Sequence, residues 1–204
     1  MVVFDATMLM LLFRPDAGQP QDSGGKRVTQ VPERIKFLTD SLQKSKTKII
    51  VPTPALSETL VHAGMDVSQS IVEEMNRSAV FHVADFDLIA AIEVAAMTRN
   101  AIVEGGKRGA GTGTWAKIKY DRQIVAIARA ARASAIYSDD ENVRTFAQQF
   151  GMPVIRTSDL PLPPEEAQPQ LPFKAPEDEL EAAIEAEETA RPEGPEPPIQ
   201  EAGP

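Results

Sequence analysis

Two acidic residues directly follow short apolar runs in the sequence. Asp5 ends the run at residues 2–4, and Asp139 follows the run at residues 135–137 after a single serine. Short apolar runs of this kind are typical of buried strands in a parallel sheet. Open α/β sheets bind their ligands at the carboxyl ends of the strands, where the strand order reverses. We therefore expect both carboxylates at a ligand-binding edge.

Two further acids belong to expected helices near the same edge. The apolar spacing after Asp121 predicts a helix that begins at this residue, so that its carboxylate caps the helix or points outward, and that ends near Ser134. Two prolines place another helix directly after the apolar run at residues 48–51, and Glu58 falls in its first turns. All four acids are thus expected at one edge of the sheet.

Clustered carboxylates repel one another, so such a group persists only when protons or cations neutralise it. Oxygen ligands without histidine or cysteine nearby suit Mg²⁺ or Mn²⁺ rather than zinc. These ions polarise a phosphate and activate water for in-line attack. Each acid alone also has a structural explanation, as a helix cap, a turn residue or a solvated helix residue. Agreement among four positions favours a metal site, because caps do not need to share one edge of a sheet.

Strands and helices alternate along the first 158 residues. Asp85 is expected to cap a long helix whose apolar stripe contains Ile89, Ile92, Ala96 and Val103, and Asp140 is expected to cap a later one. The polar stretch at residues 14–30 is expected to be a mobile loop. Expected strands lie at residues 2–4, 48–51, 80–83, 135–137 and 153–155. This alternation predicts a three-layer α/β/α sandwich with a central parallel sheet.

The composition of the chain changes near its C-terminus. From Pro161 onward the sequence holds 12 of the 30 acids, 2 of the 21 bases and 11 of the 17 prolines, so the net charge of −9 belongs to this tail and the preceding body is nearly neutral. A segment so rich in proline and acid cannot bury a core. We therefore expect a domain over residues 1–158 and a disordered acidic tail over residues 159–204.

The composition also narrows the cellular setting. The chain contains no cysteine, which excludes disulfides and thiolate chemistry. An acid at position 5 argues against a signal peptide, and no apolar run approaches the length of a membrane span. We expect a cytoplasmic protein without a membrane partner.

Basic and aromatic residues gather around the third acid. Residues 105–114 form a glycine-rich basic stretch, but they lack the Gly-x4-Gly-Lys-Ser/Thr order of a phosphate-binding loop. Cations here could hold an RNA backbone while Trp115 and Tyr120 stack on unpaired bases, although a solvated basic loop is an equally good interpretation. The candidate RNA-binding residues are Lys107, Arg108, Lys117, Lys119 and Arg122.

The order and spacing of four motifs resemble those of PIN-domain nucleases, most closely the bacterial VapC type, the toxin half of toxin–antitoxin pairs. The motifs are Phe4-Asp-Ala-Thr after the first strand, Val-Pro-Thr-Pro-Ala-Leu-Ser-Glu58, Tyr-Asp121 before an alanine-rich helix, and Ala-Ile-Tyr-Ser-Asp139-Asp-Glu-Asn. The resemblance covers residues 1–158. It implies a parallel sheet flanked by helices, Mg²⁺- or Mn²⁺-dependent cleavage of RNA, and metal-binding and catalytic roles for Asp5, Glu58, Asp121 and Asp139. It also suggests an antitoxin partner and a homodimer.

The chain departs from the family pattern in two places. The family often has Thr or Ser two residues before the fourth acid, whereas here Tyr137 occupies that position and Ser138 adjoins the acid, so Asp140 or Glu141 could share the last role. The stretch at residues 14–30 and the acidic tail look like additions to a compact toxin, which leaves a housekeeping or regulatory nuclease as an alternative.

Two other classes of protein stay open. One is a catalytically degenerate PIN fold that serves as an RNA-binding or assembly module. The other is the haloacid-dehalogenase-like phosphatases, which need a second Asp two residues after the first. Thr7 occupies that position here and argues against them.

Overall fold

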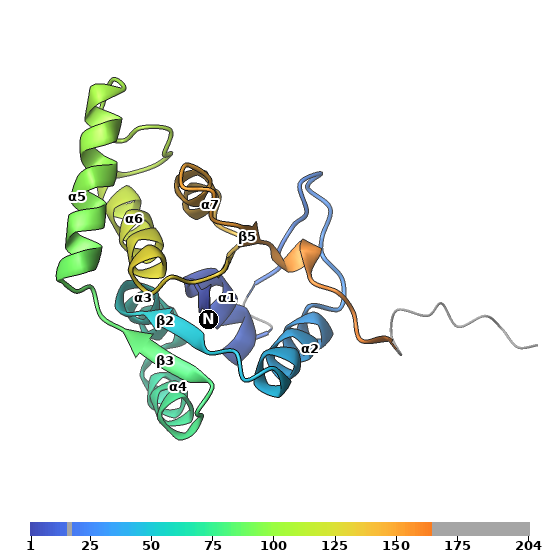
Figure 1. Ribbon diagram of the computed structural model, residues 1–204. Coiled ribbons are helices and arrows are strands. Elements are labelled where there is room, and N and C mark those ends of the chain that lie inside the picture. The colour runs from blue at the N-terminus through green and yellow to red at the C-terminus, as the bar shows by residue number, and fades with distance from the viewer. Residues whose placement is uncertain (16–17, 165–204) are drawn as a thin grey trace, which may run out of the picture. The chain divides into compact units, whose positions relative to one another are not determined.

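One parallel sheet of five strands organises the structure. The computed structural model describes residues 1–15 and 18–164 of the chain. The strands are β1 (Val2–Phe4), β2 (Ile49–Pro52), β3 (Phe81–Ala84), β4 (Ile136–Tyr137) and β5 (Val154–Ile155). They lie in the order β3-β2-β1-β4-β5, all parallel (Figure 1). The expected α/β architecture with a central parallel sheet is confirmed.

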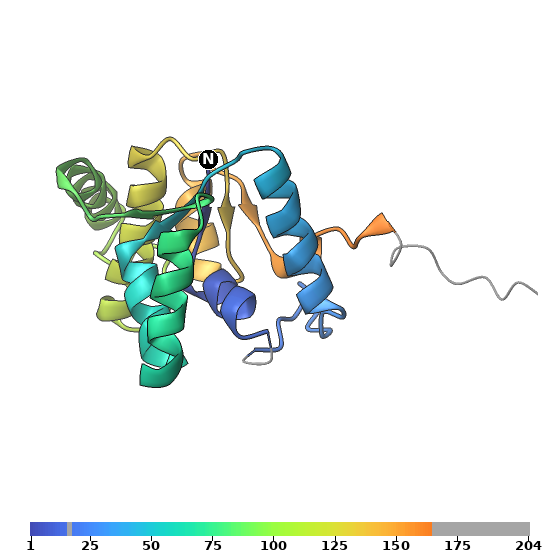
Figure 2. The same cartoon turned by 90° about the horizontal axis from the view of Figure 1, so that it is seen from below.

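Helices cover both faces of this sheet (Figures 1 and 2). The chain runs from β1 through β2 to β3 at one edge of the sheet, and then crosses back to β4 and β5 on the other side of β1. Because the crossovers are right-handed, the helices that connect β1 to β3 and those that connect β3 to β5 lie on opposite faces. A short 3₁₀ helix, Thr157–Asp159, follows β5. One face carries α1 (Ala6–Phe13), α2 (Val31–Lys44), α3 (Thr53–Ala63) and α4 (Met65–Arg77), and the other carries α5 (Leu88–Val103), α6 (Trp115–Ala130) and α7 (Glu141–Gln148).

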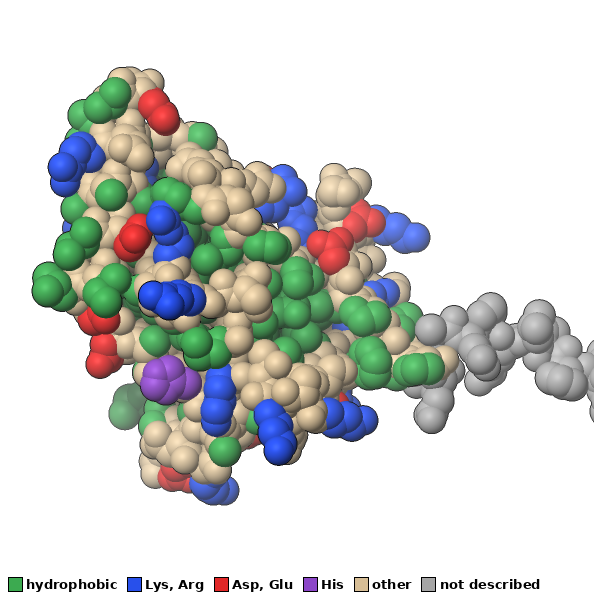
Figure 3. All heavy atoms as spheres, in the orientation of Figure 1, with side chains coloured by type: hydrophobic (Ala, Val, Ile, Leu, Met, Phe, Trp, Pro, Cys, Tyr) green, Lys and Arg blue, Asp and Glu red, His purple; other side chains and the backbone are tan. Residues whose placement is uncertain are grey.

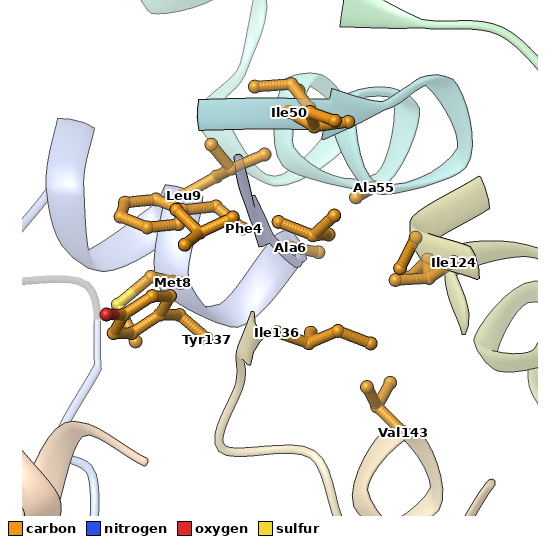
Figure 4. Close-up of a cluster of buried hydrophobic side chains, with 14 of the residues drawn as sticks. Phe4, Ala6, Met8, Leu9, Ile50, Ala55, Ile124, Ile136, Tyr137 and Val143 are labelled. Atoms are coloured by element: carbon orange, nitrogen blue, oxygen red, sulfur yellow. The ribbon is translucent and has the colours of Figure 1, made fainter. Parts of the chain in front are cut away.

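The central strand β1 is buried on both faces. Val3 pairs with Ile50 of β2 and with Ile136 of β4, and all three side chains are almost completely inaccessible. Figure 4 shows this core, in which Phe4 lies beside Leu9 of α1. Because both faces are closely packed, the residues that follow the strands have little freedom to shift.

Helix α6 begins six residues before Asp121, so the expected helix start was wrong. The Thr114 hydroxyl caps the helix by accepting from the backbone N–H of Lys117 at 3.2 Å. Buried Ile118 extends the apolar face of the helix upstream of Asp121. Asp121 therefore lies in the second turn, where its side chain faces inward. The helix also ends at Ala130, earlier than expected.

The two other expected caps have different outcomes. Asp140 caps α7 as expected, accepting from the backbone N–H groups of Asn142 at 2.8 Å and Val143 at 3.2 Å. The expected cap at Asp85 was wrong, because α5 starts later and Asp87 accepts from the N–H of Ala90 at 2.8 Å.

The expected apolar stripe of α5 exists but faces away from the core. Ile92 is 61% exposed and Val103 is 83% exposed, and Ile89 is also exposed. The opposite face of the helix packs against α6 through Ala90, Met97 and Ala101. Figure 3 shows hydrophobic side chains at the surface along α5. This helix is apolar on both sides, and only one side is buried within the chain.

The stretch at residues 18–30 is hydrogen-bonded to itself. The carboxylate of Asp22 accepts from the N–H groups of Gly24 and Lys26, both at 2.9 Å, and the N–H of Val28 donates to the carbonyl of Pro20 at 2.9 Å. Part of the expected loop is therefore an ordered turn that carries Pro20 in a defined place.

The first compact unit of the chain runs from Met1 to Pro164. Leu160, two residues past the expected domain end at residue 158, is buried, and its carbonyl accepts from Arg34 of α2. Nearly all of the expected acidic tail, from residue 165 to residue 204, lies outside the described residues. Within the described residues, no helix has the length and apolar character that a membrane span requires.

Candidate active site

Asp5 and the Ser138-Asp139 pair flank the point where the strand order reverses. Phe4 of β1 pairs directly with Tyr137 of β4, so the residues that follow them leave the sheet side by side. This is the edge at which open α/β sheets bind ligands. The structure thus brings together the two acids that the sequence placed at strand ends.

Asp5 is a buried carboxylate with a full set of donors. It caps α1 by accepting from the N–H of Met8 at 3.0 Å, and it accepts from the hydroxyl of Thr7 at 2.7 Å and from that of Ser138. Burial raises the pKa of Asp5 to about 7, although the three hydrogen bonds act in the opposite direction. This carboxyl therefore holds a proton more readily than a solvated Asp does.

Asp139 is held in place through both its backbone and its side chain. Its backbone N–H donates to the Thr7 hydroxyl at 3.0 Å. Its carboxylate accepts from the N–H of Thr157 at 2.9 Å and from the Thr157 hydroxyl at 2.6 Å. The Thr7 hydroxyl consequently links the two acids. In a haloacid-dehalogenase-like phosphatase this position would hold the second Asp.

Asp121 forms a second cluster with Lys117, Asp140 and Asn142. The Asn142 side-chain amide donates to one carboxylate oxygen of Asp121 at 2.8 Å, and the Lys117 Nζ lies 3.7 Å from the other. Burial, followed by the negative charge of Asp140, raises the pKa of Asp121 to about 6. Lys117 also hydrogen-bonds Asp140. Burial opposes the charge on Lys117, but Asp140 and Asp121 outweigh that effect and raise its pKa.

Glu58 is exposed on α3 and lies between two hollows. One hollow, of about 380 Å³, is also lined by Thr7 and Asp139, and the other, of about 350 Å³, by Lys117 and Asp121. The negative charge of Glu58 contributes to the raised pKa of Asp121. Glu58 therefore shares a hollow with each of the two clusters.

The chemistry of these donors fits Mg²⁺ or Mn²⁺, since all of them are carboxylates and the chain has no cysteine. A histidine is nevertheless close, because exposed His62 lines the same hollow as Glu58 and Asp139. The arrangement of these carboxylates is less favourable for binding a metal ion than the sequence suggested. Among the described residues, no three Asp, Glu, His or Cys side chains are grouped so that they could hold an ion. Asp139 is turned toward Thr157, and Asp121 is engaged by Asn142. The four-acid metal site thus stays a prediction.

The two alternatives for the last acid differ in position. Asp140 caps α7 with one oxygen and bonds Lys117 with the other, so it belongs to the Asp121 cluster. Glu141 is exposed and forms ion pairs with Arg144 and Arg156. Asp140 therefore faces the site, whereas Glu141 is directed to neighbouring arginines.

Arg122 is buried, which contradicts its expected contact with RNA. Its guanidinium donates to the carbonyls of Lys107 at 2.8 Å and Arg108 at 3.1 Å, and to the Thr98 hydroxyl at 3.1 Å. Its Cζ atom lies 5.0 Å from the ring centroid of Phe146. Arg122 thus holds the basic loop at residues 105–114 against the body of the protein.

The same loop has further attachments. Asn142 accepts from the N–H of Thr112 at 2.8 Å and donates to its carbonyl at 2.9 Å. A Cβ atom at Gly111 would lie only 2.6 Å from the ring of Phe146, so the loop approaches this ring more closely than any other residue allows. The exposed side chains of Lys107 and Arg108 are therefore presented from a fixed backbone.

The side chains of the remaining candidate RNA-binding residues point in different directions. Lys117 faces the acids, as described above. Lys119 is exposed and lies two residues further along α6, which places it on a different side of the helix. The Lys107 Nζ lies 5.0 Å from the ring centroid of Trp115, so this aromatic ring already has a cation beside it.

Sequence reasoning missed the neutral residues that orient the acids, namely Thr7, Asn142 and Thr157. Thr7 lies two residues after Asp5, a spacing that allows a local side-chain hydrogen bond, whereas Asn142 binds Asp121 from 21 positions further along the sequence. Thr157 carries no comparable signal, because its contact with Asp139 depends on how β5 ends.

Comparison with known proteins supports the fold. No protein-family model matches the chain, and no curated protein matches it. A chain of the VapBC2 complex from Rickettsia felis, solved bound to a DNA fragment from their promoter, aligns with a TM-score of 0.53 and 11% identity over 76% of this chain and 98% of that chain. A chain of the DNA-bound VapBC from Salmonella typhimurium aligns with a TM-score of 0.49 and 14% identity over 76% and 97%. The first similarity confirms the expected VapC-like PIN fold.

Replacing Asp5 by Asn should stabilise the metal-free protein at pH 8. Because the folded-state pKa is raised, the carboxyl costs nothing below its ordinary pKa of 3.8 and costs most above about 7. We expect the Asn variant to melt at least about 3 °C higher than wild type at pH 8 in chelator, with the gap closing toward pH 4. Melting curves at both pH values measure this. A lower melting temperature at pH 8 would mean that Asp5 is needed as a charged cap.

Replacing buried Arg122 by Met should destabilise the fold, because the carbonyls of Lys107 and Arg108 lose the donor that holds the basic loop. We expect a loss of about 2 to 4 kcal/mol in the free energy of unfolding, measured with urea. The matched control is Lys119→Met, an exposed position on the same helix, which should change stability by less than about 0.5 kcal/mol. Equal effects of the two substitutions would contradict the structural role of Arg122.

Proposed function

We propose that this chain, with its VapC-like PIN fold, is a metal-dependent endoribonuclease. The observation that supports this most is the position of the acids at the switch point of the sheet. Asp5 and Asp139 follow adjacent parallel strands and are linked through Thr7, and Glu58 lines a hollow shared with each of the two clusters. An edge of this kind is where a phosphate-bearing substrate and its cation would meet.

The proposed metal ligands are Asp5, Glu58, Asp121 and Asp139, with Asp140 as an additional candidate. A bound Mg²⁺ or Mn²⁺ would polarise the phosphodiester and activate water, so no covalent intermediate is expected. The raised pKa values of Asp5 and Asp121 support this proposal, since they report buried negative charge that a cation would offset.

The chain's own residues have separate roles in this proposal. Ser138 and Thr7 orient Asp5, and Asn142 orients Asp121. Lys117 neutralises part of the negative charge of Asp121 and Asp140. These contacts hold the carboxylates in place without adding reactive groups.

RNA would approach along the fixed basic loop. Lys107 and Arg108 are exposed there, and exposed Lys119 and Tyr120 lie on the neighbouring helix α6. Positive side chains of this kind hold a phosphate backbone without reading its sequence, and an exposed ring can stack on an unpaired base. The proposed substrate is therefore single-stranded RNA.

The biological setting that fits best is a toxin–antitoxin pair. One similar structure is the VapBC2 complex from Rickettsia felis bound to a DNA fragment from their promoter. An antitoxin partner for this chain is part of the proposal, and an open reading frame for a small DNA-binding protein directly upstream would support it.

One observation favours a second candidate, an RNA-binding or assembly module without catalysis. In the described residues no three acids are grouped to hold an ion, and Asp139 is fully engaged by Thr157. A degenerate site of this type would bind RNA but would show no metal-dependent cleavage. The experiment below distinguishes the two candidates.

Purified protein should cleave single-stranded RNA in Mn²⁺ and lose this activity in chelator. Asp121→Asn should lower the rate at least about 100-fold, since replacing a residue that merely orients a ligand already costs about 10- to 100-fold. Asp66→Asn, at an exposed position in the first turn of α4, is the matched control and should keep full activity. Binding without cleavage by wild type would favour the module, and full activity of Asp121→Asn would refute the proposed site.

A second copy of the chain is the proposed partner for the exposed face of α5. The face carries exposed Leu88, Ile92 and Val103 together with the charged Arg99, and exposed Val83 of the edge strand β3 and Phe86 precede the helix in the sequence. Helices that are apolar on all sides are normally covered. An apolar face of this kind is complementary to itself, as the interface of a two-fold dimer requires.

Ile92→Asp should therefore convert a dimer to a monomer. Wild type should scatter light with twice the chain mass of 22.2 kDa, whereas the variant should show that mass at the same concentration. Val61→Asp, on α3 and also highly exposed, should leave the dimer intact. A monomeric wild type at micromolar concentration would exclude a stable homodimer.

A further inference from the structure

The hollow beside Glu58 and Asp139 has features beyond those of a metal site. It measures about 380 Å³ and lies between α1, α3 and the ordered turn that follows Gly18. This volume is near the lower end of the range of about 300 to 1,000 Å³ that is typical of small-molecule sites. It has room for one flat heterocycle rather than for a nucleic-acid duplex.

The walls of the hollow are apolar and fixed. Met10 and Leu11 of α1 form one wall, and Pro20 forms part of another. The carbonyl of Pro20 accepts from Val28, which holds this wall in place. Arg14 donates to the carbonyl of His62 at 3.3 Å and so ties the end of α1 to α3. A planar ring would be in contact with apolar atoms on its faces.

Two polar side chains lie at the rim, and neither belongs to the proposed metal site. Gln19 and His62 both line the hollow and both are exposed. A glutamine amide offers a donor and an acceptor together, and a neutral imidazole offers one of each. These are the groups that recognise the Watson–Crick or Hoogsteen edge of an unpaired base.

We propose that this hollow binds one unpaired nucleobase of the RNA substrate, with Gln19 and His62 reading its edge. This inference rests on the proposed ribonuclease function and deepens it. The hollow is continuous with Glu58 and Asp139, so the bound base belongs to a nucleotide adjacent to the cleaved phosphate. Base preference at that one position is then set by the pocket, while the basic loop binds backbone of any sequence.

The first test uses the four nucleosides as probes and the full chain without metal. Nucleosides lack phosphate, and no metal is added, so binding through a phosphate–cation contact is excluded. We expect ligand-observed NMR to detect binding of at least one nucleoside at millimolar concentration. Gly18→Leu should weaken it at least about tenfold, because an added Cβ meets only Leu11, at 3.5 Å, and a longer side chain would then fill the hollow.

Matched controls come from the same residue types elsewhere on the surface. Gln43→Ala and His82→Ala change exposed residues on α2 and β3 and should bind nucleosides as wild type does, whereas Gln19→Ala and His62→Ala should bind more weakly. The proposal would be overturned if wild type bound no nucleoside. It would also be overturned if Gly18→Leu and Gln19→Ala bound nucleosides as tightly as wild type does. A melting curve for each variant shows whether it is folded.

The second test maps cleavage sites in a pool of random single-stranded RNA. Gln19→Ala and His62→Ala should change the base preference at one position next to the cut about tenfold, with the two control variants unchanged. The same base preference next to the cleavage site in wild type and in all variants would refute base recognition by Gln19 and His62. If wild type does not cleave RNA, the ribonuclease proposal fails, and the nucleoside measurement then decides the pocket by itself.

Discussion

The buried carboxyl of Asp5 constrains the rest of the site. It follows the central strand of the sheet, where it has lost the hydration that would stabilise its charge, and its donors are Thr7 and Met8 next to it in the sequence and Ser138, which is 133 positions away. Thr7 and Ser138 cannot move without leaving this carboxyl unsatisfied. Since Thr7 also binds the backbone of Asp139, the two acids are fixed relative to each other by neutral side chains rather than by charge. The switch point of the sheet is therefore rigid before any ligand arrives.

Much of the fold could be predicted from the sequence, because its strands are continuous apolar runs that end abruptly. Asp5 and Asp139 could be placed at one edge for the same reason. Asp121 lies beside Asp140 near this edge, but the argument that placed it there was wrong, since it lies inside a helix and not at its start. Local spacing could not separate these cases, because the apolar face of α6 continues upstream to Ile118 and the cap is a threonine one residue before Trp115.

Side-chain orientation was the part that the sequence could not supply. Arg122 belongs to a run of basic residues, and only the structure shows that its guanidinium is turned inward to the loop carbonyls. The stripe on α5 raises the same difficulty, since apolar residues at helical spacing predict a covered face without saying which molecule covers it. Thr157 depends on the path of the chain after β5, which no pattern near Asp139 reports. The PIN fold thus follows from the sequence more readily than the contacts that orient its acids.

The order of the strands also governs when the site can form during synthesis. β1 is made first, yet one of its two neighbours is β4, which contains residues 136 and 137, and Asp5 receives a hydrogen bond from Ser138. Contacts between residues so far apart in sequence form late in folding. A nascent chain that has completed α6 therefore still has an open central strand and an unpaired first acid. The carboxylate edge can therefore be completed only after residues 136–139 have left the ribosome, when most of the described domain has already been made.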